Sequence, residues 1–158
     1  MGILSCTDPS TKIAQKNKDI VIKAFEVVAH GDYDNFNTYI ADNYVRHCQA
    51  TPDLHITSLD GFKEFIRVDR IACPDQTLEV KKLVAENDLV AFWAVYRGTQ
   101  TGPSGPFPPS NKKVELKFSG IHRLEGNKIV ETWVTWDNIA YLSQLGHFPP
   151  PDNTMETE

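Results

Sequence analysis

The sequence predicts one α+β domain, in which helices cover a curved antiparallel sheet. Apolar residues follow a helical period before Pro74 and a period of two after it. The helical period returns after Asp137, near the C-terminus. Three helices, a strongly curved sheet and one final helix would form two packed layers, and helices over the concave face would leave a pocket.

Three helices are expected in the first half of the chain. The first runs from about residue 12 to 30, because its apolar residues recur three and four positions apart and Gly31 follows as a stop signal. A short second helix is expected within residues 32–40, packing on the first. The third lies within residues 57–68, where Ser58 suits the N-cap position.

Two strands are expected within residues 76–98, where Val, Phe, Trp and Tyr are frequent and Glu86–Asp88 forms a turn. The next segment, residues 101–111, contains four of the chain's ten prolines and is expected to be irregular. Long loops inside a domain are often lids or binding elements, although a permissive surface loop fits this composition equally well.

A last pair of strands is expected on either side of a turn at Glu125–Asn127. From Lys112 to Leu124 most even-numbered residues are apolar, so this row is predicted to face the interior. His122 belongs to the same row and is therefore predicted to point inward.

The turn decides which residues of the last strand share that interior face. A two-residue turn would place Phe118 opposite Thr135, whereas a three-residue loop would place it opposite Val134. The second register is favoured, because the residues that it places on the inner face are Val130, Thr132, Val134 and Trp136. Trp133 then points outward, where a large exposed aromatic side chain indicates a second layer or a dimer contact.

Length and composition indicate a globular protein of one domain. The 158 residues are 41% hydrophobic and 23% charged, and the predicted domain spans residues 12–148 between disordered tails at 1–11 and 149–158. The net charge of −5 argues against nucleic-acid binding, which needs clustered Lys and Arg. The sequence contains no run of about 20 apolar residues that could span a membrane.

The three cysteines, Cys6, Cys48 and Cys73, are odd in number and widely separated, which fits neither a disulfide framework nor a metal site. A reducing, cytoplasmic location is the simplest interpretation. Leu4-Ser5-Cys6 resembles the end of a bacterial lipoprotein signal but lacks its apolar core, so a truncated signal is left open. The spacing of His and Asp residues does not support a metal site either.

Several short phrases resemble the SnoaL-like polyketide cyclases of the nuclear transport factor two-like superfamily. They are "YVRH" at 44–47, "CPD" at 73–75, "RGTQTG" at 97–102, "GNKIVETW" at 126–133 and "QLG" at 144–146. The order and spacing of these phrases carry the resemblance, because each phrase alone is common. Together with the expected order of elements, they cover residues from about 17 to 146.

The resemblance implies a cone-shaped α+β barrel, usually a homodimer, with an apolar pocket for a ring-bearing substrate and no cofactor. Cyclases of this kind close a ring by intramolecular aldol condensation. An aspartate on the last strand is their acid/base, helped by a histidine on the preceding strand. The implied partners are therefore a small cyclic or polyketide-like molecule and a second copy of the chain.

The chain departs from this family pattern at both catalytic positions. Matching the phrases around the last turn places Val134 where the family has its aspartate and Gly120 where it has the helper histidine. Neither residue can move a proton. The Thr-His pair that is common after the glycine of the third phrase is Thr99-Gln100 in this chain.

Three other residues are candidates for acid/base chemistry. His122 lies on the predicted inner row, and its ordinary pKa of about 6.5 suits proton transfer, although a hydrogen-bonded core histidine is the competing interpretation. His47 follows the second helix, where family members line the pocket mouth, or else it is a surface or interface residue. Asp137 precedes a helix, where it caps free backbone amides, with or without a second role at the pocket rim.

Two functions are compatible with these observations. The predicted substrate-binding wall consists of Tyr44, Phe92, Phe118, Val134 and Trp136. In the first function, the domain binds a small apolar cyclic or polyketide-like molecule and catalyses its cyclisation, isomerisation or dehydration. In the second, it is a non-catalytic binding domain that has lost the aspartate of the family, as Val134 favours.

Overall fold

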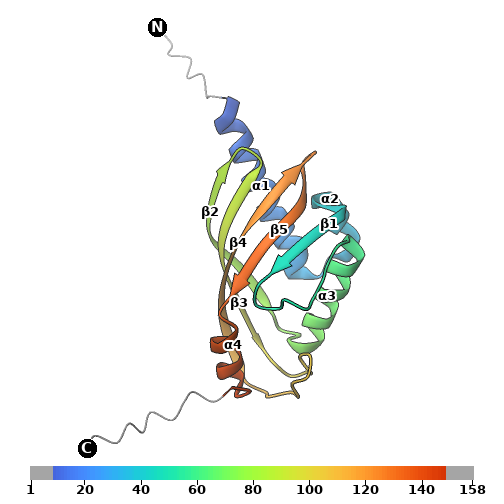
Figure 1. Cartoon of the computed structure of the whole chain (residues 1–158), viewed down its shortest axis with the longest axis vertical. Coiled ribbons are helices and arrows are strands. Elements are labelled where there is room, and N and C mark those ends of the chain that lie inside the picture. The colour runs from blue at the N-terminus through green and yellow to red at the C-terminus, as the bar shows by residue number, and fades with distance from the viewer. Residues whose placement is uncertain (1–8, 149–158) are drawn as a thin grey trace, which may run out of the picture.

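A computed structural model describes residues 9–148, in which five strands form one curved sheet and helices cover its inner face (Figure 1). The helices are α1 (Pro9–His30), α2 (Phe36–Tyr39), α3 (Leu59–Ala72) and α4 (Asn138–Leu145), with a 3-10 turn at Tyr33–Asn35. The strands are β1 (Ile40–Cys48), β2 (Thr77–Glu86), β3 (Leu89–Thr99), β4 (Lys113–Glu125) and β5 (Lys128–Trp136). The predicted α+β class, with its curved sheet, is confirmed.

The sheet is mixed rather than purely antiparallel, which corrects one part of the predicted fold. Its strands lie in the order β1-β5-β4-β3-β2, and β1 runs parallel to β5 while every other neighbouring pair is antiparallel. Because α3 and three strands separate β1 from β5 in the chain, no hairpin turn fixes their relative direction. The edge strands β1 and β2 do not meet, so the sheet stays open instead of closing into a barrel.

The turn between β4 and β5 has two residues, not the expected three. Gly126 and Asn127 both have positive φ angles, 56° and 68°, which are typical of a type I′ hairpin turn. Glu125 and Lys128 pair on either side of it. Glycine and asparagine adopt this left-handed backbone at the lowest cost, which explains why this pair occupies the turn.

A β-bulge follows this turn directly. Leu124 lies opposite Ile129, whereas the preceding residue, Arg123, lies opposite Glu131. Val130 is therefore an extra residue on β5, and the bulge shifts all later pairs of these two strands by one position.

The bulge changes the register of β5 but leaves the predicted residues on its inner face. Phe118 lies opposite Trp136. The favoured register placed it opposite Val134 and the alternative opposite Thr135, so both predicted registers were wrong. The shift from Val134 amounts to two residues, and side chains alternate with a period of two. Val134 and Trp136 therefore face inward as predicted, and Trp133 points outward with 41% of its surface exposed.

The ends of two helices differ from expectation. α1 begins at Pro9, so residues 9–11 are helical rather than part of the predicted N-terminal tail. α3 continues to Ala72, and the predicted N-cap is confirmed, because the Ser58 side chain accepts a hydrogen bond from the backbone N–H of Gly61 at 3.1 Å. The rest of the predicted tails, with Leu4-Ser5-Cys6, lies outside the described residues. Within residues 9–148, no helix is long and apolar enough to cross a membrane.

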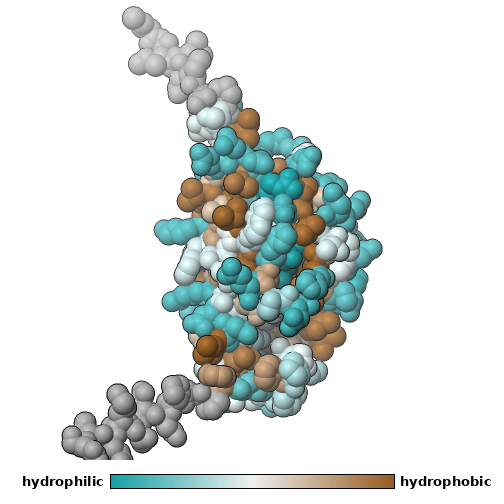
Figure 2. Space-filling view, viewed as in Figure 1, coloured by the Kyte–Doolittle hydropathy of each residue, from teal (hydrophilic) through white to brown (hydrophobic). Residues whose placement is uncertain are grey.

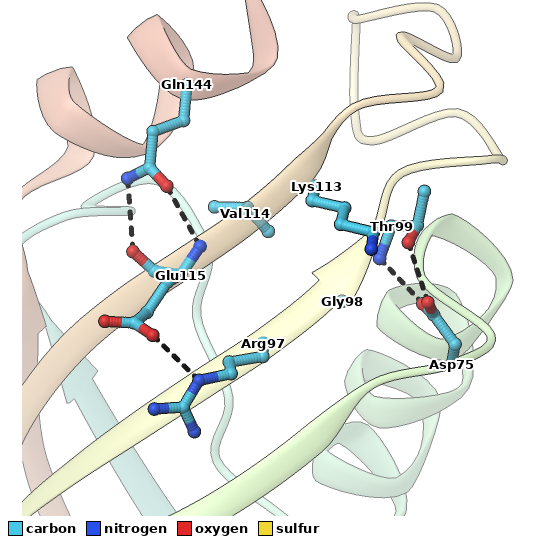
Figure 3. Close-up of a pocket in the computed structure, with 8 residues that line it drawn as sticks. All are labelled: Asp75, Arg97, Gly98, Thr99, Lys113, Val114, Glu115 and Gln144. Carbon is cyan, nitrogen blue, oxygen red and sulfur yellow. Dashed lines mark hydrogen bonds and ion pairs between the residues drawn. The ribbon is translucent and has the colours of Figure 1, made fainter.

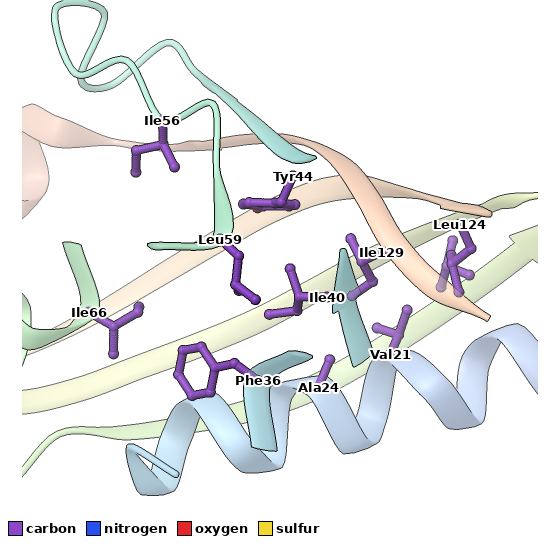
Figure 4. Packing of buried hydrophobic residues seen from close by; sticks show 11 residues of the cluster. Val21, Ala24, Phe36, Ile40, Tyr44, Ile56, Leu59, Ile66, Leu124 and Ile129 are labelled. Carbon is purple, nitrogen blue, oxygen red and sulfur yellow. The ribbon is translucent and has the colours of Figure 1, made fainter. Parts of the chain in front are cut away.

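Two clusters of buried side chains hold the helices against the sheet. The larger one joins α1, α2 and α3 to β1 and to the start of β5, as Figure 4 shows. Its buried members are Val21, Ala24, Phe36, Ile40, Tyr44, Ile56, Leu59, Ile66, Val90, Leu124 and Ile129. The smaller cluster joins the end of α3 to β3, β4 and α4, through Ala72, Cys73, Tyr96, Val114 and Leu145.

Gln100 organises the proline-rich segment at the end of the sheet. Its side chain is fully buried, its Nε2 donates to the Pro108 carbonyl oxygen at 3.1 Å, and its Oε1 accepts from Nε2 of His147 at 3.0 Å. The His147 ring in turn stacks on Phe107 with ring centroids 4.8 Å apart. Residues 101–111 are irregular, as predicted, and Gln100 ties them to the end of α4.

Candidate functional site

Three polar residues form a row across the inner face of the sheet. Arg46 on β1 pairs with Thr132 on β5, and Thr132 pairs with His122 on β4. Directly paired residues have side chains on the same face and close together. All three are buried, so the inner face carries a polar row beneath the helices.

His122 is held in an aromatic environment. Its Nδ1 lies 2.8 Å from Oγ1 of Thr132, and its Nε2 is buried without a hydrogen-bond partner among residues 9–148. The ring stacks on Phe92, with centroids 4.7 Å apart, and meets the edge of Phe25 at 5.8 Å. Burial lowers the pKa of His122 to about 3, because the charged imidazolium would lose its hydration. The imidazole is therefore neutral and a weak base.

His47 lies on the other face of the sheet. Neighbouring residues on a strand point to opposite sides, and Arg46 points inward. The His47 ring stacks on Trp133 at 5.5 Å, and its Nε2 lies 2.9 Å from the Glu131 carboxylate. The structure therefore separates His47 from His122, and the sheet lies between them.

Asp137 caps α4, as one of its two predicted roles required. Its carboxylate accepts a hydrogen bond from the backbone N–H of Ala140 at 2.9 Å, and the side chain is exposed. The capping interaction accounts for this carboxylate at the junction of β5 and α4.

Val134 and Gly120 lie opposite each other on the inner face, and Phe92 on β3 lies opposite Gly120. A Cβ atom at position 120 would lie 2.3 Å from the carbonyl oxygen of Trp133 and 2.8 Å from the Phe92 ring. The space that a side chain at this position would need is therefore filled. A histidine at position 120 would require both the sheet and Phe92 to move.

The predicted substrate-binding wall divides into two parts. Tyr44 and Phe92 are buried in the core, and burial raises the pKa of Tyr44 to about 12. Phe118, Val134 and Trp136 also face inward, but each is only half-buried. A residue that points under the helices and keeps part of its surface exposed borders space that solvent reaches. The part of the wall that solvent reaches therefore consists of these three side chains on β4 and β5.

Arg46 is the first of three polar residues near this wall that the sequence interpretation missed. Its guanidinium lies over the Phe65 ring at 4.6 Å and near the Trp136 ring at 5.7 Å. Its side chain is buried, and its Nη1 has no hydrogen-bond partner among residues 9–148. Alternation along "YVRH" places Arg46 on the same face as Tyr44, so the sequence contained a signal for its inward position.

Asp69 and Tyr96 are the other two. Asp69 lies on α3, one turn after Phe65, which is spacing that places both on one face of the helix. Burial raises the pKa of Asp69 to about 6, while Tyr96, Arg70 and Arg46 lower it by smaller amounts. The Tyr96 hydroxyl lies near Asp69 and Cys73 but meets no partner in hydrogen-bond geometry within residues 9–148.

Two open grooves lie on the surface. One, of about 490 Å³, has most of its polar side chains engaged in hydrogen bonds or ion pairs with neighbours (Figure 3). There Asp75 accepts from the Thr99 backbone N–H at 2.6 Å, and Glu115 accepts from Arg97 at 2.8 Å. The other, of about 460 Å³, lies between α1 and β2, and Phe25 is part of its wall. Among residues 9–148, no three His, Cys, Asp or Glu side chains gather closely enough to hold a metal ion.

Comparison with known proteins agrees with the fold. A family model described as SnoaL-like polyketide cyclase matches residues 19–145. The chain belongs to this family. No curated protein sequence matches it.

Solved structures of this family share the fold. The crystal structure of IdmH, a candidate polyketide cyclase from Streptomyces antibioticus, is 28% identical, with 82% of this chain and 98% of that chain covered and a TM-score of 0.72. AclR, a candidate hydroxylase from Streptomyces galilaeus, is 23% identical, with coverage of 87% and 85% and a TM-score of 0.74. A candidate SnoaL-like polyketide cyclase from Jannaschia sp. CCS1 is 19% identical, with coverage of 91% and 98% and a TM-score of 0.79.

The neutral state of His122 predicts a specific dependence of stability on pH. Its pKa is about 3 in the folded chain, and an unfolded histidine has a pKa of about 6.5. As the pH falls through this interval, the unfolded chain binds a proton that the folded chain does not, so His122 lowers the free energy of unfolding by about 1.4 kcal/mol per pH unit. Urea denaturation of wild type and His122→Gln at pH 6, 5 and 4 should show the shallower slope in the variant. The exposed His55→Gln variant is the control, and equal slopes in all three proteins would contradict a neutral His122.

Proposed function

We propose that this chain binds a small ring-bearing molecule under its helices and catalyses an acid/base cyclisation or isomerisation of it. The observation that supports this proposal is the accessible inner wall formed by Phe118, Val134 and Trp136. Aromatic and aliphatic side chains of this kind suit a flat apolar ring. The buried polar atoms of Arg46 and Tyr96, which lack partners within residues 9–148, border the same interior and would orient a ligand that carries oxygen atoms.

The family supports cyclisation as the class of reaction. IdmH, which is 28% identical to this chain, is a candidate polyketide cyclase. An aldol cyclisation needs a base that removes a carbon-bound proton and a donor that stabilises the enolate oxygen. The neutral, weakly basic His122, the outward-facing His47 and the capping Asp137 do not suit the role of this base.

A non-catalytic binding domain is the competing function. Val134 favours it, because an apolar side chain replaces the proton-transfer group that the family resemblance implies. The filled space beside Gly120 favours it as well, since a helper histidine cannot be accommodated there. Both functions need the same binding wall, so they differ in turnover and not in ligand binding.

A larger side chain at position 134 should weaken ligand binding. Val134→Phe would add a ring to the accessible interior, whereas Thr135→Phe would add the same ring to the outer face of the same strand. Saturation-transfer NMR with a panel of ketones of one to three fused rings, including 2-tetralone, should show binding to wild type and Thr135→Phe. Binding to Val134→Phe should weaken by tenfold or more. Equal binding to the two variants would place the ligand elsewhere, and wild type that binds none of the panel would contradict the proposal.

We also propose that the chain forms a homodimer through the outer face of the sheet. Trp93, Ile121 and Trp133 are 46%, 41% and 41% exposed, and Ile121 pairs directly with Trp133. Arg123 and Glu131 form an ion pair beside them, with 3.0 Å between Nε and the carboxylate. A twofold axis through such a face would stack the apolar residues and set opposite charges against each other. Figure 2 shows this face, where hydrophobic side chains are interspersed among hydrophilic ones.

A charge in the middle of this face should separate the dimer. Trp133→Glu would place an unpaired carboxylate in the proposed interface, which costs desolvation energy in the dimer alone. Sedimentation velocity over a range of concentrations should give a dimer for wild type and a monomer for Trp133→Glu. Ile139→Glu is the matched control, since Ile139 is an exposed apolar residue on α4, 61% exposed, away from the outer face. A wild-type protein that is monomeric at all concentrations would refute the interface.

A further inference from the structure

A group of polar side chains lies where α3 faces the inner side of the sheet. Arg46 reaches it from β1, Asp69 from α3 and Tyr96 from β3. These elements are far apart in the sequence. Arg46 also belongs to the polar row with Thr132 and His122. The Phe65 and Trp136 rings lie 4.6 and 5.7 Å from the Arg46 guanidinium and link it to the accessible wall.

Arg46 carries a buried positive charge that the protein leaves partly unpaired. Its side chain is 7% exposed, and its Nη1 meets no acceptor within residues 9–148. A guanidinium keeps its charge at any physiological pH, so it cannot avoid the cost of burial by losing a proton. The neighbouring rings of Phe65 and Trp136 stabilise the cation but do not accept its N–H groups. An oxygen atom of a ligand would satisfy this donor.

Like Arg46, Asp69 carries a charged group without an ion-pair partner among residues 9–148. It is half-buried on the face of α3 that carries Phe65 and Ile66, and it pairs with no Lys, Arg or His within 4 Å among the described residues. The Tyr96 hydroxyl, 8% exposed as a residue and without a partner within residues 9–148, lies beside it. The side chains that influence Asp69 electrostatically are Arg46 from β1, Arg70 from α3, Cys73 at the C-cap of α3, Tyr96 from β3 and Tyr141 from α4.

We propose that Asp69 is the proton acceptor of this interior site and that Arg46 binds the oxygen of an enolisable carbonyl ligand. This inference rests on the proposed small-molecule function and names its substrate class and its base. Tyr96 acts as a positioning residue for the Asp69 carboxylate. The base then stands on α3 and not at position 134 of β5, where the family resemblance implies an aspartate.

The chemistry balances without a co-reactant. The Asp69 carboxylate takes a proton from the carbon next to the ligand carbonyl, so a C–H bond breaks and an O–H bond forms. The electron pair moves to the carbonyl oxygen, and Arg46 stabilises the resulting enolate with its free N–H group. In an isomerisation, Asp69 returns the proton to another carbon of the ligand. In a cyclisation, the enolate carbon bonds to a second carbonyl carbon, and the new alkoxide takes the proton back from Asp69.

The pKa of Asp69 suits this role. At about 6 it leaves the carboxylate ionised at neutral pH, yet makes it a stronger base than an ordinary aspartate. The cause is burial, and the opposing influence of Tyr96 is the next largest. Loss of the Tyr96 hydroxyl would therefore raise the pKa of Asp69 further.

Hydrogen–deuterium exchange of 2-tetralone in D2O tests the inference without knowledge of the natural substrate. Its C1 protons exchange only when a base removes them, and proton NMR follows their loss. Wild type should accelerate this exchange above the buffer rate, and Asp69→Asn should lose about 100-fold of the acceleration. Arg46→Met should lose tenfold or more. Glu64→Gln and Arg67→Met are the matched controls on the exposed side of α3, and both should exchange as wild type does.

The pH profile separates a base from a structural role. The exchange rate of wild type should rise with pH up to about 6 and then level off, following ionisation of Asp69. Tyr96→Phe should shift this midpoint to higher pH while exchange remains. Asp69→Asn should unfold at a temperature no lower than wild type at pH 7, because it removes a buried charge that is unfavourable in the folded state.

The possible results distinguish the assignment of Asp69 as the base from the proposed ligand binding. Binding of 2-tetralone by wild type with no accelerated exchange, or exchange in Asp69→Asn equal to that in Glu64→Gln, would overturn the assignment of Asp69 and leave the binding proposal intact. Absence of 2-tetralone binding to wild type, together with failure of the whole ketone panel, would overturn the proposed function and this inference with it.

Discussion

The packing of Phe92 against Gly120 sets the conditions for the rest of the interior. Because position 120 has no side chain, the Phe92 ring can lie against the sheet, and it then stacks on His122. Phe118 and Phe25 complete the cluster, with ring centroids 5.6 and 5.1 Å from that of Phe92. This cluster excludes water from the His122 ring. The same packing excludes a helper histidine from position 120, so the apolar Val134 and the glycine opposite it are parts of one arrangement.

Burial affects proton transfer at His122 and at Asp69 in opposite ways. Burial among rings lowers the pKa of His122 to about 3, whereas burial on the inner side of α3 raises the pKa of Asp69 to about 6. Both shifts have the same cause, because burial always disfavours the charged form. The result is a neutral histidine that hardly accepts protons and a carboxylate that accepts them near neutral pH.

The sequence predicted the inner and outer faces of β4 and β5 and, through the resemblance, the family. It did not predict the register, because the bulge at Val130 leaves no mark in the alternation that surrounds it. The strand β1 itself and its parallel pairing with β5 were also missed. Parallel partners are joined by no hairpin turn whose residues could be recognised. Arg46 and Asp69 were overlooked because a charged residue is exposed by default, and only the packing of α3 on the sheet places both inside. His47, in contrast, was a candidate for the pocket mouth, and the alternation of side chains along β1 points it to the outer face.

The proposed proton transfer depends most directly on the ionisation of Asp69. The carboxyl carbon resonance of Asp69, identified by its absence from the Asp69→Asn variant, can be followed by carbon-13 NMR between pH 3 and 8. We expect a midpoint near 6, which corresponds to a buried carboxyl group close to Tyr96 and Arg46. A midpoint at or below about 4, the value of an ordinary exposed aspartate, would contradict it.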